Sequence, residues 1–353
     1  MNARIVLLPG DGIVPEVVDA ASAVLQRVAE RSGHSFVFVE ELIGGAALRE
    51  DYPALPQETL RTCQEADAVL LGAVGHPDFD YLPPSGRPES GLLALRRGLG
   101  VFANLRPARA WRGLEGASPL KPDVLRGTDM VVVRELAGGL YYGEPRGTHA
   151  DGRSAVNTLT YSRDEVTRIA RVAFDLARTR RRSVVSVDKA NVLEVSRLWR
   201  DVVNEVARDY PDVSLSHEYV DAAAMKLALT PSAFDVVLTE NMFGDILSDE
   251  AGAICGSLGL LPSASLGPGP GLFEPVHGSA PALTDRNLAN PIGAILSGAM
   301  LLSDGLGLRS EGQAVVDAVE RAIACGHRTA DLTITGCHSI GTAEMTAAIL
   351  SEL

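Results

Sequence analysis

Short apolar runs alternate with amphipathic stretches along most of this chain, and this alternation restricts the possible folds more than any other sequence feature. The apolar runs have the length and composition of buried strands, at residues 5–8, 66–74, 128–136, 183–189 and 233–241. Between them, apolar residues recur at helical spacing in residues 15–31, 162–180 and 196–211. Strands that alternate with helices favour a mixed or parallel sheet covered by helices. We therefore predict an α/β fold.

The composition excludes several classes of partner. A chain of 353 residues with 46% hydrophobic residues can fill more than one core. A formal net charge of −13 argues against a general nucleic-acid or anionic-membrane surface, because phosphate binding needs clustered lysine and arginine. The sequence shows no signal peptide and no run of 18 apolar residues, and its four cysteines are widely spaced without a CxxC. We therefore expect a cytoplasmic enzyme with no membrane segment.

The stretch TENMFGDILSDEAG places two aspartates, Asp245 and Asp249, four residues apart. In a helix these side chains share a face and repel each other unless a cation lies between them. Carboxylate oxygens suit Mg²⁺ or Mn²⁺, whereas zinc prefers histidine or cysteine. The alternative for an isolated DxxxD is a solvated polar helix face. The chain also offers arginine, lysine and tyrosine residues of the kind that bind an anionic substrate beside a metal ion. Their presence favours the metal site over the solvated helix face.

The glycine-rich motifs do not indicate a common nucleotide-binding fold. PGDG follows the first strand and opens a helix, yet the chain has no GxGxxG at that point and no Walker pattern. A Rossmann fold is therefore unsupported. Residues 261–281 are rich in Gly, Pro and Ser, which predicts a long loop. Within it, GPGPG at 267–271 is interpreted as a turn in preference to a phosphate loop.

Nine motifs occur in an order that resembles one enzyme family: LPGDGI, ESGLLALRR, FANLRP, VVVREL, GGLYYGEPRG, VDKANVLE, FGDILSDEAG, LPSASLG and EPVHGSAP. The whole chain is similar to the β-decarboxylating dehydrogenases of the isocitrate/isopropylmalate dehydrogenase family. The resemblance implies a two-domain α/β fold with a mixed central sheet. It further implies a discontinuous cofactor-binding domain at 1–101 plus 256–353, and a dimerisation and substrate/metal domain at 102–255.

The resemblance also implies a reaction, in which a 2-hydroxy acid is oxidised at C2 and then loses CO₂ from C3. Three arginines match the family's carboxylate-binding residues: Arg96, Arg106 and Arg134. The motifs NLRP and VVVREL place the last two at predicted strand ends. Three aspartates match its Mg²⁺ or Mn²⁺ ligands: Asp221, Asp245 and Asp249. Alternatively, Asp249 supports the other two without touching the ion. Lys189 is implied as the base that removes the hydroxyl proton, and Tyr141 as the acid that reprotonates the enolate.

The family builds each active site from two subunits. The resemblance therefore implies a homodimer with shared active sites, in which Lys189 and Asp221 serve the partner's site. Composition and periodicity alone do not predict this dimer.

For the cofactor, the resemblance implies NAD, held by residues that match the family's motif: Glu89, His277, Gly278, Ser279, Ala280, Pro281 and Asn290. The chain departs from the family at Ala282, where NAD-using members usually carry an acidic residue. Asp285 can substitute for the missing acid from the next turn. Arg286 nearby would instead favour the 2′-phosphate of NADP, which remains an alternative.

For the substrate, Leu92 and Leu93 match the hydrophobic residues that receive an alkyl side chain. The implied reaction is the conversion of 3-isopropylmalate to 4-methyl-2-oxopentanoate in leucine biosynthesis. Each methylene in an apolar pocket discriminates by only about 1 to 3 kcal/mol, so the length of the alkyl group stays open. The same chemistry on a larger alkylmalate, tartrate, malate or homoisocitrate is an alternative. A non-catalytic binding subunit is a further alternative.

Overall fold

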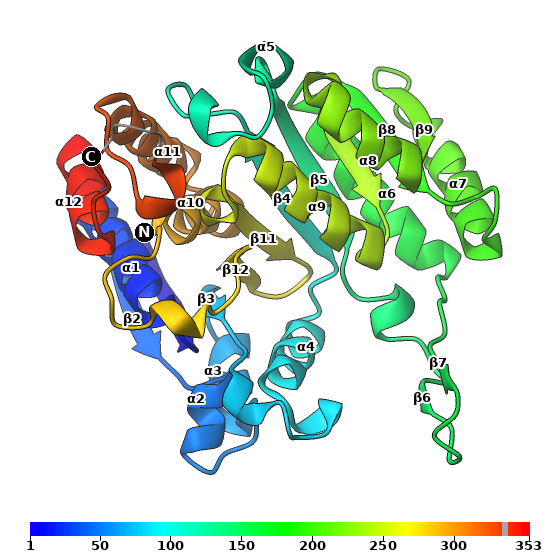
Figure 1. The fold of residues 1–353 in the computed structure, drawn as a ribbon, viewed down its shortest axis with the longest axis horizontal. Coiled ribbons are helices and arrows are strands. Elements are labelled where there is room, and N and C mark those ends of the chain that lie inside the picture. The colour runs from blue at the N-terminus through cyan, green and yellow to red at the C-terminus, as the bar shows by residue number, and fades with distance from the viewer. Residues whose placement is uncertain (334–337) are drawn as a thin grey trace. The chain divides into compact units, whose positions relative to one another are not determined.

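The computed structural model describes residues 1–333 and 338–353, so Cys337 lies outside the described residues. The chain divides into two compact units. Unit 1 comprises Met1–Val101, Trp111–Pro119 and Cys255–Leu353, and unit 2 comprises Phe102–Ala110 and Leu120–Ile254. Both units combine sheet and helices, which confirms the predicted α/β fold (Figure 1).

Unit 1 contains a mixed sheet with the strand order β2-β1-β3-β12-β11. Parallel pairing joins β1 to β2 and to β3, and β3 to β12, whereas β11 and β12 are antiparallel. Its strands are β1 (Asn2–Gly10), β2 (Ser35–Glu40), β3 (Ala68–Ala73), β11 (Pro262–Leu266) and β12 (Gly271–Pro275). Its helices are α1 (Val14–Ser32), α2 (Gly44–Arg49), α3 (Gln57–Gln64), α4 (Pro88–Leu99), α10 (Ile292–Met300), α11 (Arg309–Ala324) and α12 (Thr342–Glu352).

The core of unit 1 forms where α1 and α10 pack against the sheet and α11 and α12 pack on these two helices (Figure 1). Helix α1 buries Val17, Val18, Ala21, Val24 and Leu25, which recur at the spacing of one helix face. The predicted long loop at 261–281 is wrong. Residues 262–266 and 271–275 form the antiparallel strands β11 and β12, and GPGPG supplies the turn between them.

Within unit 2 the strand order is β4-β5-β10-β8-β9, with both parallel and antiparallel pairs. Only the β4–β5 pair is antiparallel among the pairings described for these five strands. The strands are β4 (Ala103–Arg109), β5 (Asp129–Glu135), β8 (Ser183–Asp188), β9 (Ser214–Tyr219) and β10 (Val236–Thr239), with a small hairpin of β6 (Gly147–Thr148) and β7 (Ala155–Val156). The helices are α5 (Pro122–Leu125), α6 (Arg163–Arg178), α7 (Glu194–Ala207), α8 (Val220–Leu229) and α9 (Asn241–Cys255).

The carboxyl ends of four parallel strands meet at one edge of the unit 2 sheet. At this edge β5 ends in the VVVREL motif, β10 leads into α9, β8 leads to Lys189, and β9 leads into α8. Polar groups gather at such edges because the loops after parallel strands converge there. Sheet topology therefore assembles most of the predicted site residues of unit 2.

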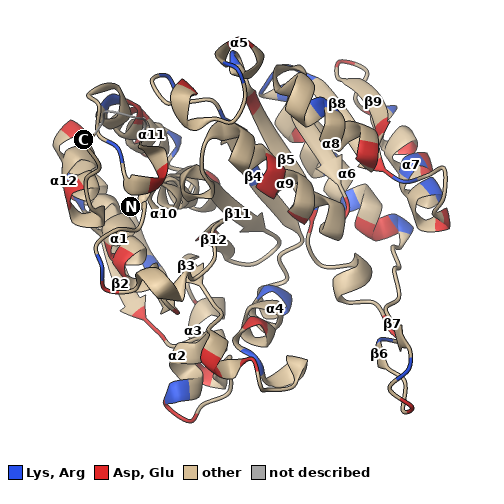
Figure 2. Cartoon of the chain, in the orientation of Figure 1, with Lys and Arg blue, Asp and Glu red and all other residues tan. Residues whose placement is uncertain are grey.

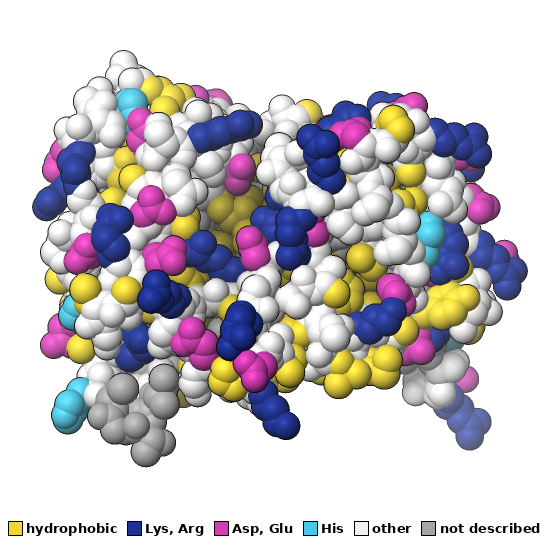
Figure 3. Space-filling view, turned by 90° about the horizontal axis from the view of Figure 1, so that it is seen from above, with side chains coloured by type: hydrophobic (Ala, Val, Ile, Leu, Met, Phe, Trp, Pro, Cys, Tyr) yellow, Lys and Arg dark blue, Asp and Glu magenta, His cyan; other side chains and the backbone are white. Residues whose placement is uncertain are grey.

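Charged residues of both signs are mixed over the described part of the chain. Acidic and basic residues are interspersed along the helices of each unit (Figure 2), and Lys and Arg side chains are scattered over the face drawn in Figure 3. In the described part of the chain, no helix combines the length and the apolar character that a membrane crossing requires.

Candidate active site

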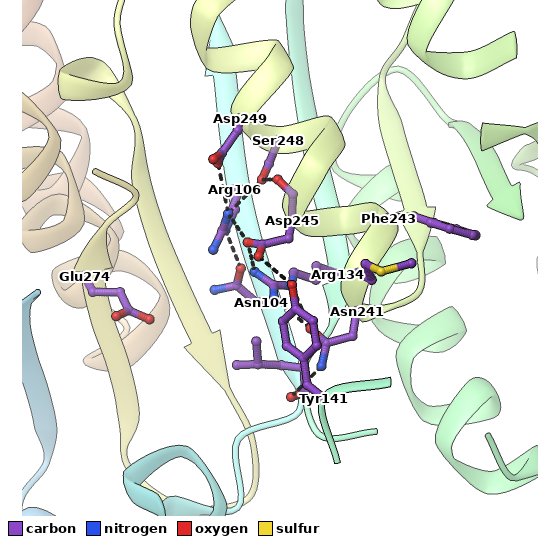
Figure 4. A network of polar contacts seen from close by, with 12 residues as sticks. Asn104, Arg106, Arg134, Tyr141, Asn241, Phe243, Asp245, Ser248, Asp249 and Glu274 are labelled. Carbon is purple, nitrogen blue, oxygen red and sulfur yellow. Dashed lines mark hydrogen bonds and ion pairs between the residues drawn. The ribbon is translucent and has the colours of Figure 1, made fainter. Parts of the chain in front are cut away.

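Three side chains converge on the carboxylate of Asp245 in α9. Tyr141 Oη donates a hydrogen bond to Asp245 Oδ2 at 3.0 Å. Both Arg134 Nη1 and Arg106 Nη1 donate to Asp245 Oδ1, the latter at 3.2 Å. Figure 4 shows these contacts arriving at Asp245 from three different segments of unit 2. Unit 2 therefore carries a compact cluster of two cations, a phenol and a carboxylate.

The register of the β4–β5 pair places the two arginines side by side. Asn104 of β4 lies directly opposite Arg134 of β5, so both side chains project from the same face of the sheet. Arg106 lies two residues beyond Asn104 and therefore shares that face. Its Nε donates to Asn104 Oδ1 at 2.8 Å, which holds the guanidinium beside Arg134. The expectation that Arg106 lies at a strand end is wrong, because β4 continues to Arg109.

Arg134 is 1% exposed, and the start of α9 holds it in place. Asn241, the first residue of the helix, accepts hydrogen bonds from Arg134 Nη2 at 2.7 Å and Nε at 3.1 Å. The side-chain Nδ2 of Asn241 donates to two backbone carbonyls, those of Leu136 and Gly138. Gly244 provides the room, because a Cβ there would lie 2.6 Å from Arg134 Cγ. The Asn-x-x-Gly spacing at the helix start thus creates the socket for this buried guanidinium.

Asp249 lies one turn beyond Asp245 on α9, as the spacing predicts. Arg106 Nη1 is 3.6 Å from Asp249 Oδ1 and 3.2 Å from Asp245 Oδ1, so a guanidinium is the cation that separates the two carboxylates in this structure. Burial raises the pKa of Asp249, while Arg106 lowers it and the Asp245 charge raises it further. A second cation at this position would therefore favour the ionised form of Asp249.

Tyr141 ends a short 3₁₀ turn, Gly139–Tyr141, that follows β5. Burial raises the pKa of its hydroxyl, and the neighbouring Asp245 carboxylate raises it further. Arg134 lies over the ring, with its guanidinium carbon 5.7 Å from the ring centroid. A phenol with a raised pKa keeps its proton near neutral pH, which suits a group that must donate it.

Lys189 and Asp221 form a second polar pair in unit 2. Lys189 directly follows β8, and Asp221 is the second residue of α8, directly after β9. Because β8 and β9 are parallel neighbours, both residues lie at the same end of the sheet, and Lys189 Nζ donates to the Asp221 carboxylate. This contact lowers the pKa of Asp221.

Asp221 does not join Asp245 and Asp249 within one chain. Across the residues that the structure covers, no group of three or more His, Cys, Asp or Glu side chains is placed to share a metal ion. One chain thus supplies a pair of carboxylates on α9 and, apart from it, a carboxylate paired with a lysine.

Unit 1 contains a pocket of about 280 Å³ beside the HGSAP segment. Among the predicted cofactor residues, His277, Gly278, Ala280 and Asn290 line it, whereas Glu89, Ser279, Pro281 and Asp285 do not. The remaining lining residues are Ile13, Gly259, Leu283, Leu288, Ala289, Ala330 and Asp331. The pocket is therefore largely apolar, with polar groups at a few positions, as is typical of a small-molecule site.

Three side chains give the pocket its polarity, those of His277, Asn290 and Asp331. The Nε2 atom of His277 is buried and has no hydrogen-bond partner among the described residues, and burial lowers the pKa of the imidazole. Asn290 Nδ2 donates to Asp331 Oδ2 at 3.0 Å, so Asp331 brings a carboxylate to the pocket wall. Sequence reasoning missed Asp331, which lies 41 residues beyond Asn290 and belongs to none of the motifs.

The Ser279 segment holds the loop in place instead of lining the pocket. Ser279 Oγ donates to Gly75 O at 2.6 Å, and Ser279 O accepts from the Ile13 amide at 2.9 Å. The aspartate of PGDG has a related structural role. Asp11 is 1% exposed and accepts hydrogen bonds from the amides of Gly45 and Gly75 at 2.8 and 2.9 Å. PGDG thus ties loops of unit 1 together.

Arg96 shares one face of α4 with the two leucines of ESGLLALRR. Leu92 and Leu93 lie four and three residues before it, and both are half-buried. The Arg96 side chain is buried and its Nη2 donates to Glu274 Oε1 of β12 at 2.6 Å. Glu274 is another residue that sequence reasoning misses, because the Gly, Pro and Ser content of its segment predicts a loop.

Comparison with known proteins connects these features to one family. The sequence profile described as isocitrate/isopropylmalate dehydrogenase matches residues 4–349. The chain belongs to the isocitrate/isopropylmalate dehydrogenase family. Among relatives in this family, the 3-isopropylmalate dehydrogenase of Geobacillus kaustophilus is 56% identical over 98% of this chain and 94% of its own length. That of Aquifex aeolicus is 51% identical over 99% of this chain and 97% of its own length.

Solved structures of isocitrate/isopropylmalate dehydrogenase relatives share the fold. The isocitrate dehydrogenase of Methylococcus capsulatus has a TM-score of 0.89 at 34% identity and covers 99% of both chains. A β-decarboxylating dehydrogenase of Thermococcus kodakarensis has a TM-score of 0.81 at 37% identity, over 99% of this chain and 96% of that one. These matches confirm the resemblance that the nine motifs carry.

Proposed function

We propose that this protein catalyses the oxidative decarboxylation of 3-isopropylmalate to 4-methyl-2-oxopentanoate, in leucine biosynthesis. The observation that carries the proposal is the cluster on α9, in which Arg106, Arg134 and Tyr141 all contact Asp245. Relatives named 3-isopropylmalate dehydrogenase are 51% to 56% identical to essentially the whole chain, which supports the choice of substrate.

The donor set of α9 fits Mg²⁺ or Mn²⁺. Asp245 and Asp249 offer carboxylate oxygens on successive turns, and the raised pKa of Asp249 reflects a charge that a nearby cation would stabilise. The charges of the two carboxylates and the two guanidiniums cancel. A dianionic substrate and a divalent ion would also cancel, so their joint binding would not change the net charge of the site. The ion would supply Lewis-acid stabilisation of the developing oxyanion. We assign Asp221 of the partner subunit as the third ligand, in a homodimer with shared sites.

The protein's own side chains supply binding and proton transfer. Arg106 and Arg134 bind the substrate carboxylates through charge-assisted hydrogen bonds. The assignment of Arg96, Leu92 and Leu93 to the same substrate rests on the ESGLLALRR motif. Lys189 of the partner subunit, in its neutral form, accepts the proton of the 2-hydroxyl. Tyr141 then donates its proton to C3 of the decarboxylated enolate.

The pocket of unit 1 fits the adenosine part of a nicotinamide dinucleotide. Dehydrogenases of this family depend in general on NAD and a divalent metal ion. The buried Nε2 of His277 needs a hydrogen-bond partner that a ligand can provide. Asp331 favours NAD over NADP, because a carboxylate in the pocket wall repels a 2′-phosphate. The bound cofactor would supply the acceptor for the hydride of C2.

NADP is the second candidate, and one contact favours it. Arg286 Nη1 lies 3.5 Å from the carbonyl oxygen of Ala282, so a guanidinium borders the position where the acidic residue is missing. We retain NAD as the proposal because Asp331 lines the pocket and Arg286 does not.

Steady-state turnover of the purified protein tests the function. We expect reduction of NAD with 3-isopropylmalate and Mg²⁺, and much slower reduction of NADP or with malate, tartrate or isocitrate. Lys189→Met should abolish turnover while the dimer persists. Turnover of another acid only, or with NADP only, would contradict the corresponding part of the proposal. No turnover on any of them would favour a non-catalytic binding subunit.

A further inference from the structure

The segment that carries Lys189 is held by α7 through three successive contacts. Arg200 of α7 forms a two-point ion pair with Asp188, with Nε donating to Oδ2 at 2.9 Å and Nη2 donating to Oδ1 at 2.8 Å. The backbone amide of Lys189 donates to Ser196 Oγ of α7 at 3.1 Å. One turn of α7, from Ser196 to Arg200, therefore holds the Asp188 side chain and the Lys189 amide.

Asp188 is well suited to transmit this restraint. Its side chain is 2% exposed, and Oδ1 also accepts the amide of Ala190 at 2.9 Å. The carboxylate thus connects Arg200 to the backbone directly after Lys189. Without its guanidinium partner, this buried charge would have to move toward solvent and take the Lys189 segment with it.

The same guanidinium also contacts the segment that carries Asp221. The guanidinium carbon of Arg200 lies 5.2 Å from the ring centroid of Tyr219, the last residue of β9. Tyr219 pairs with Asp188 across the parallel strands, and Asp221 follows two residues later. Arg200 is therefore in contact with the strand ends that lead to both members of the Lys189–Asp221 pair.

We propose that Arg200 is a positioning residue that sets the relative geometry of Lys189 and Asp221, acting through Asp188 and Tyr219. Its role in turnover rests on the proposed function, because it requires Lys189 to be the base. Its role in geometry does not, and can be measured without any substrate.

Unit 2 contains a second arginine–aspartate pair beside a tyrosine ring, and this pair serves as a control for the loss of an arginine. Arg178 Nη2 donates to Asp212 Oδ1 at 2.7 Å, its Nε contacts both carboxylate oxygens, and its guanidinium carbon lies 4.4 Å from the Tyr210 ring centroid. The residue types and contacts are those of Arg200, Asp188 and Tyr219, although the Asp212 side chain is 36% exposed and that of Asp188 is 2% exposed. Neither Lys189 nor Asp221 belongs to this second group, so Arg178→Met reports the general effect of losing such an arginine.

The first measurement is the reactivity of the Lys189 amine in the intact protein. The chain has three lysines, Lys121, Lys189 and Lys226, so reductive methylation with formaldehyde and dimethylamine-borane can be followed at each by peptide mass spectrometry. We expect Arg200→Met to raise the labelling rate of Lys189 at least threefold relative to the exposed Lys121. Arg178→Met should leave that ratio unchanged.

The second measurement is turnover of 3-isopropylmalate. We expect Arg200→Met to lower kcat at least tenfold with KM within threefold, and Arg200→Lys to recover part of the loss. Unchanged labelling, unchanged kcat, or an equal loss of kcat in Arg178→Met would overturn the inference.

If Arg200→Met does not fold, the double variant Asp188→Asn/Arg200→Met removes the buried charge with its partner and is tested in the same way. A wild-type protein without turnover would contradict the proposed function, while the labelling ratio would still decide the positioning role.

Discussion

Asp245 is the residue on which the unit 2 site depends most, because it accepts from a phenol and two guanidiniums at once. Each of these groups comes from a different segment, so Asp245 sets their relative positions before any substrate binds. Arrangements of this kind lower the reorganisation that a charged substrate would otherwise require. The hydroxyl of Tyr141 is the one group among them that can transfer a proton.

Tyr141→Phe removes that proton donor while it retains the ring beneath Arg134. We expect kcat for 3-isopropylmalate to fall about 100-fold or more, because general acid catalysis typically contributes 10²–10⁴-fold. KM should change little, since both arginines keep their contacts with Asp245. Tyr142→Phe, at the adjacent position, is the control and should keep kcat near the wild-type value. Equal kcat in the two variants would exclude Tyr141 as the acid.

At the scale of elements, α9 functions as a platform whose first turn binds Arg134 and whose second and third turns carry the two aspartates. The close approach of Arg134 to Gly244 is what allows this packing, with a Cβ predicted to meet Arg134 Cγ at 2.6 Å and Cβ at 2.8 Å. A glycine inside a helix otherwise costs up to about 1 kcal/mol relative to alanine. Glycine at this position therefore lowers the stability of the helix, but it allows the Arg134 side chain to pack against the helix backbone.

Helix propensity alone predicts that Gly244→Ala stabilises the protein. We expect the opposite. We expect a loss of about 1 to 3 kcal/mol in unfolding free energy from overpacking, together with a KM for 3-isopropylmalate raised at least fivefold as Arg134 is displaced. Urea denaturation and steady-state kinetics measure the two effects. Gly298→Ala in α10 is the control, because the nearest atom to its Cβ would be Leu25 Cγ, at an ordinary 3.5 Å. A stabilised Gly244→Ala enzyme with unchanged KM would show that the contact is unimportant.

Sequence periodicity predicts the helices and strands whose buried residues recur regularly. It does not predict strands that are buried because they pair with strands distant in the sequence. Helix α6 buries Val166, Ile169, Ala170 and Ala173 at helical spacing, and its segment was identified from that pattern. Strands β11 and β12 have five residues each and contain proline, serine or glycine. They are strands because β12 pairs with both β3 and β11, and those partners are not visible locally.

The same limit applies to the site. The spacing of Asp245 and Asp249 predicts that they share a helix face, and the structure confirms it. The proximity of Arg106 to Arg134 follows from the register between two strands that are separated by residues 110–128, and no local pattern encodes that register. Asn241 was missed for a similar reason, although TEN directly before MFGD was a signal that a polar group opens the helix.

At the scale of the whole molecule, the separation of Lys189 and Asp221 from the α9 aspartates makes one chain chemically incomplete under the proposed function. Large apolar side chains are exposed on unit 2, with Met225 at 55%, Leu229 at 61% and Ile246 at 57%. The first two lie on α8, the helix that also carries Asp221. We infer that a second copy of this chain covers them and brings Asp221 to the partner's site.

Leu229→Asp should therefore convert the dimer to monomers, because the carboxylate would be buried without a partner at the interface. We expect size-exclusion chromatography with light scattering to give the monomer mass, and turnover to fall at least tenfold at low protein concentration. Val37→Asp, at an apolar residue of unit 1 that is 58% exposed, should leave both unchanged. A dimeric and fully active Leu229→Asp variant would contradict the shared site.

The antiparallel pairing of β4 with β5 has a consequence for how related chains can differ in length. Asn104, Arg106 and Arg134 share one face only in the present register, and a shift of one residue in either strand would turn its side chains to the opposite face. One inserted or deleted codon within 103–109 or 129–135 would thus remove a guanidinium from the cluster as completely as a substitution. The exposed hairpin of β6 and β7 carries no such restriction. Gaps in an alignment of functional relatives belong in that hairpin and not in the two arginine-bearing strands.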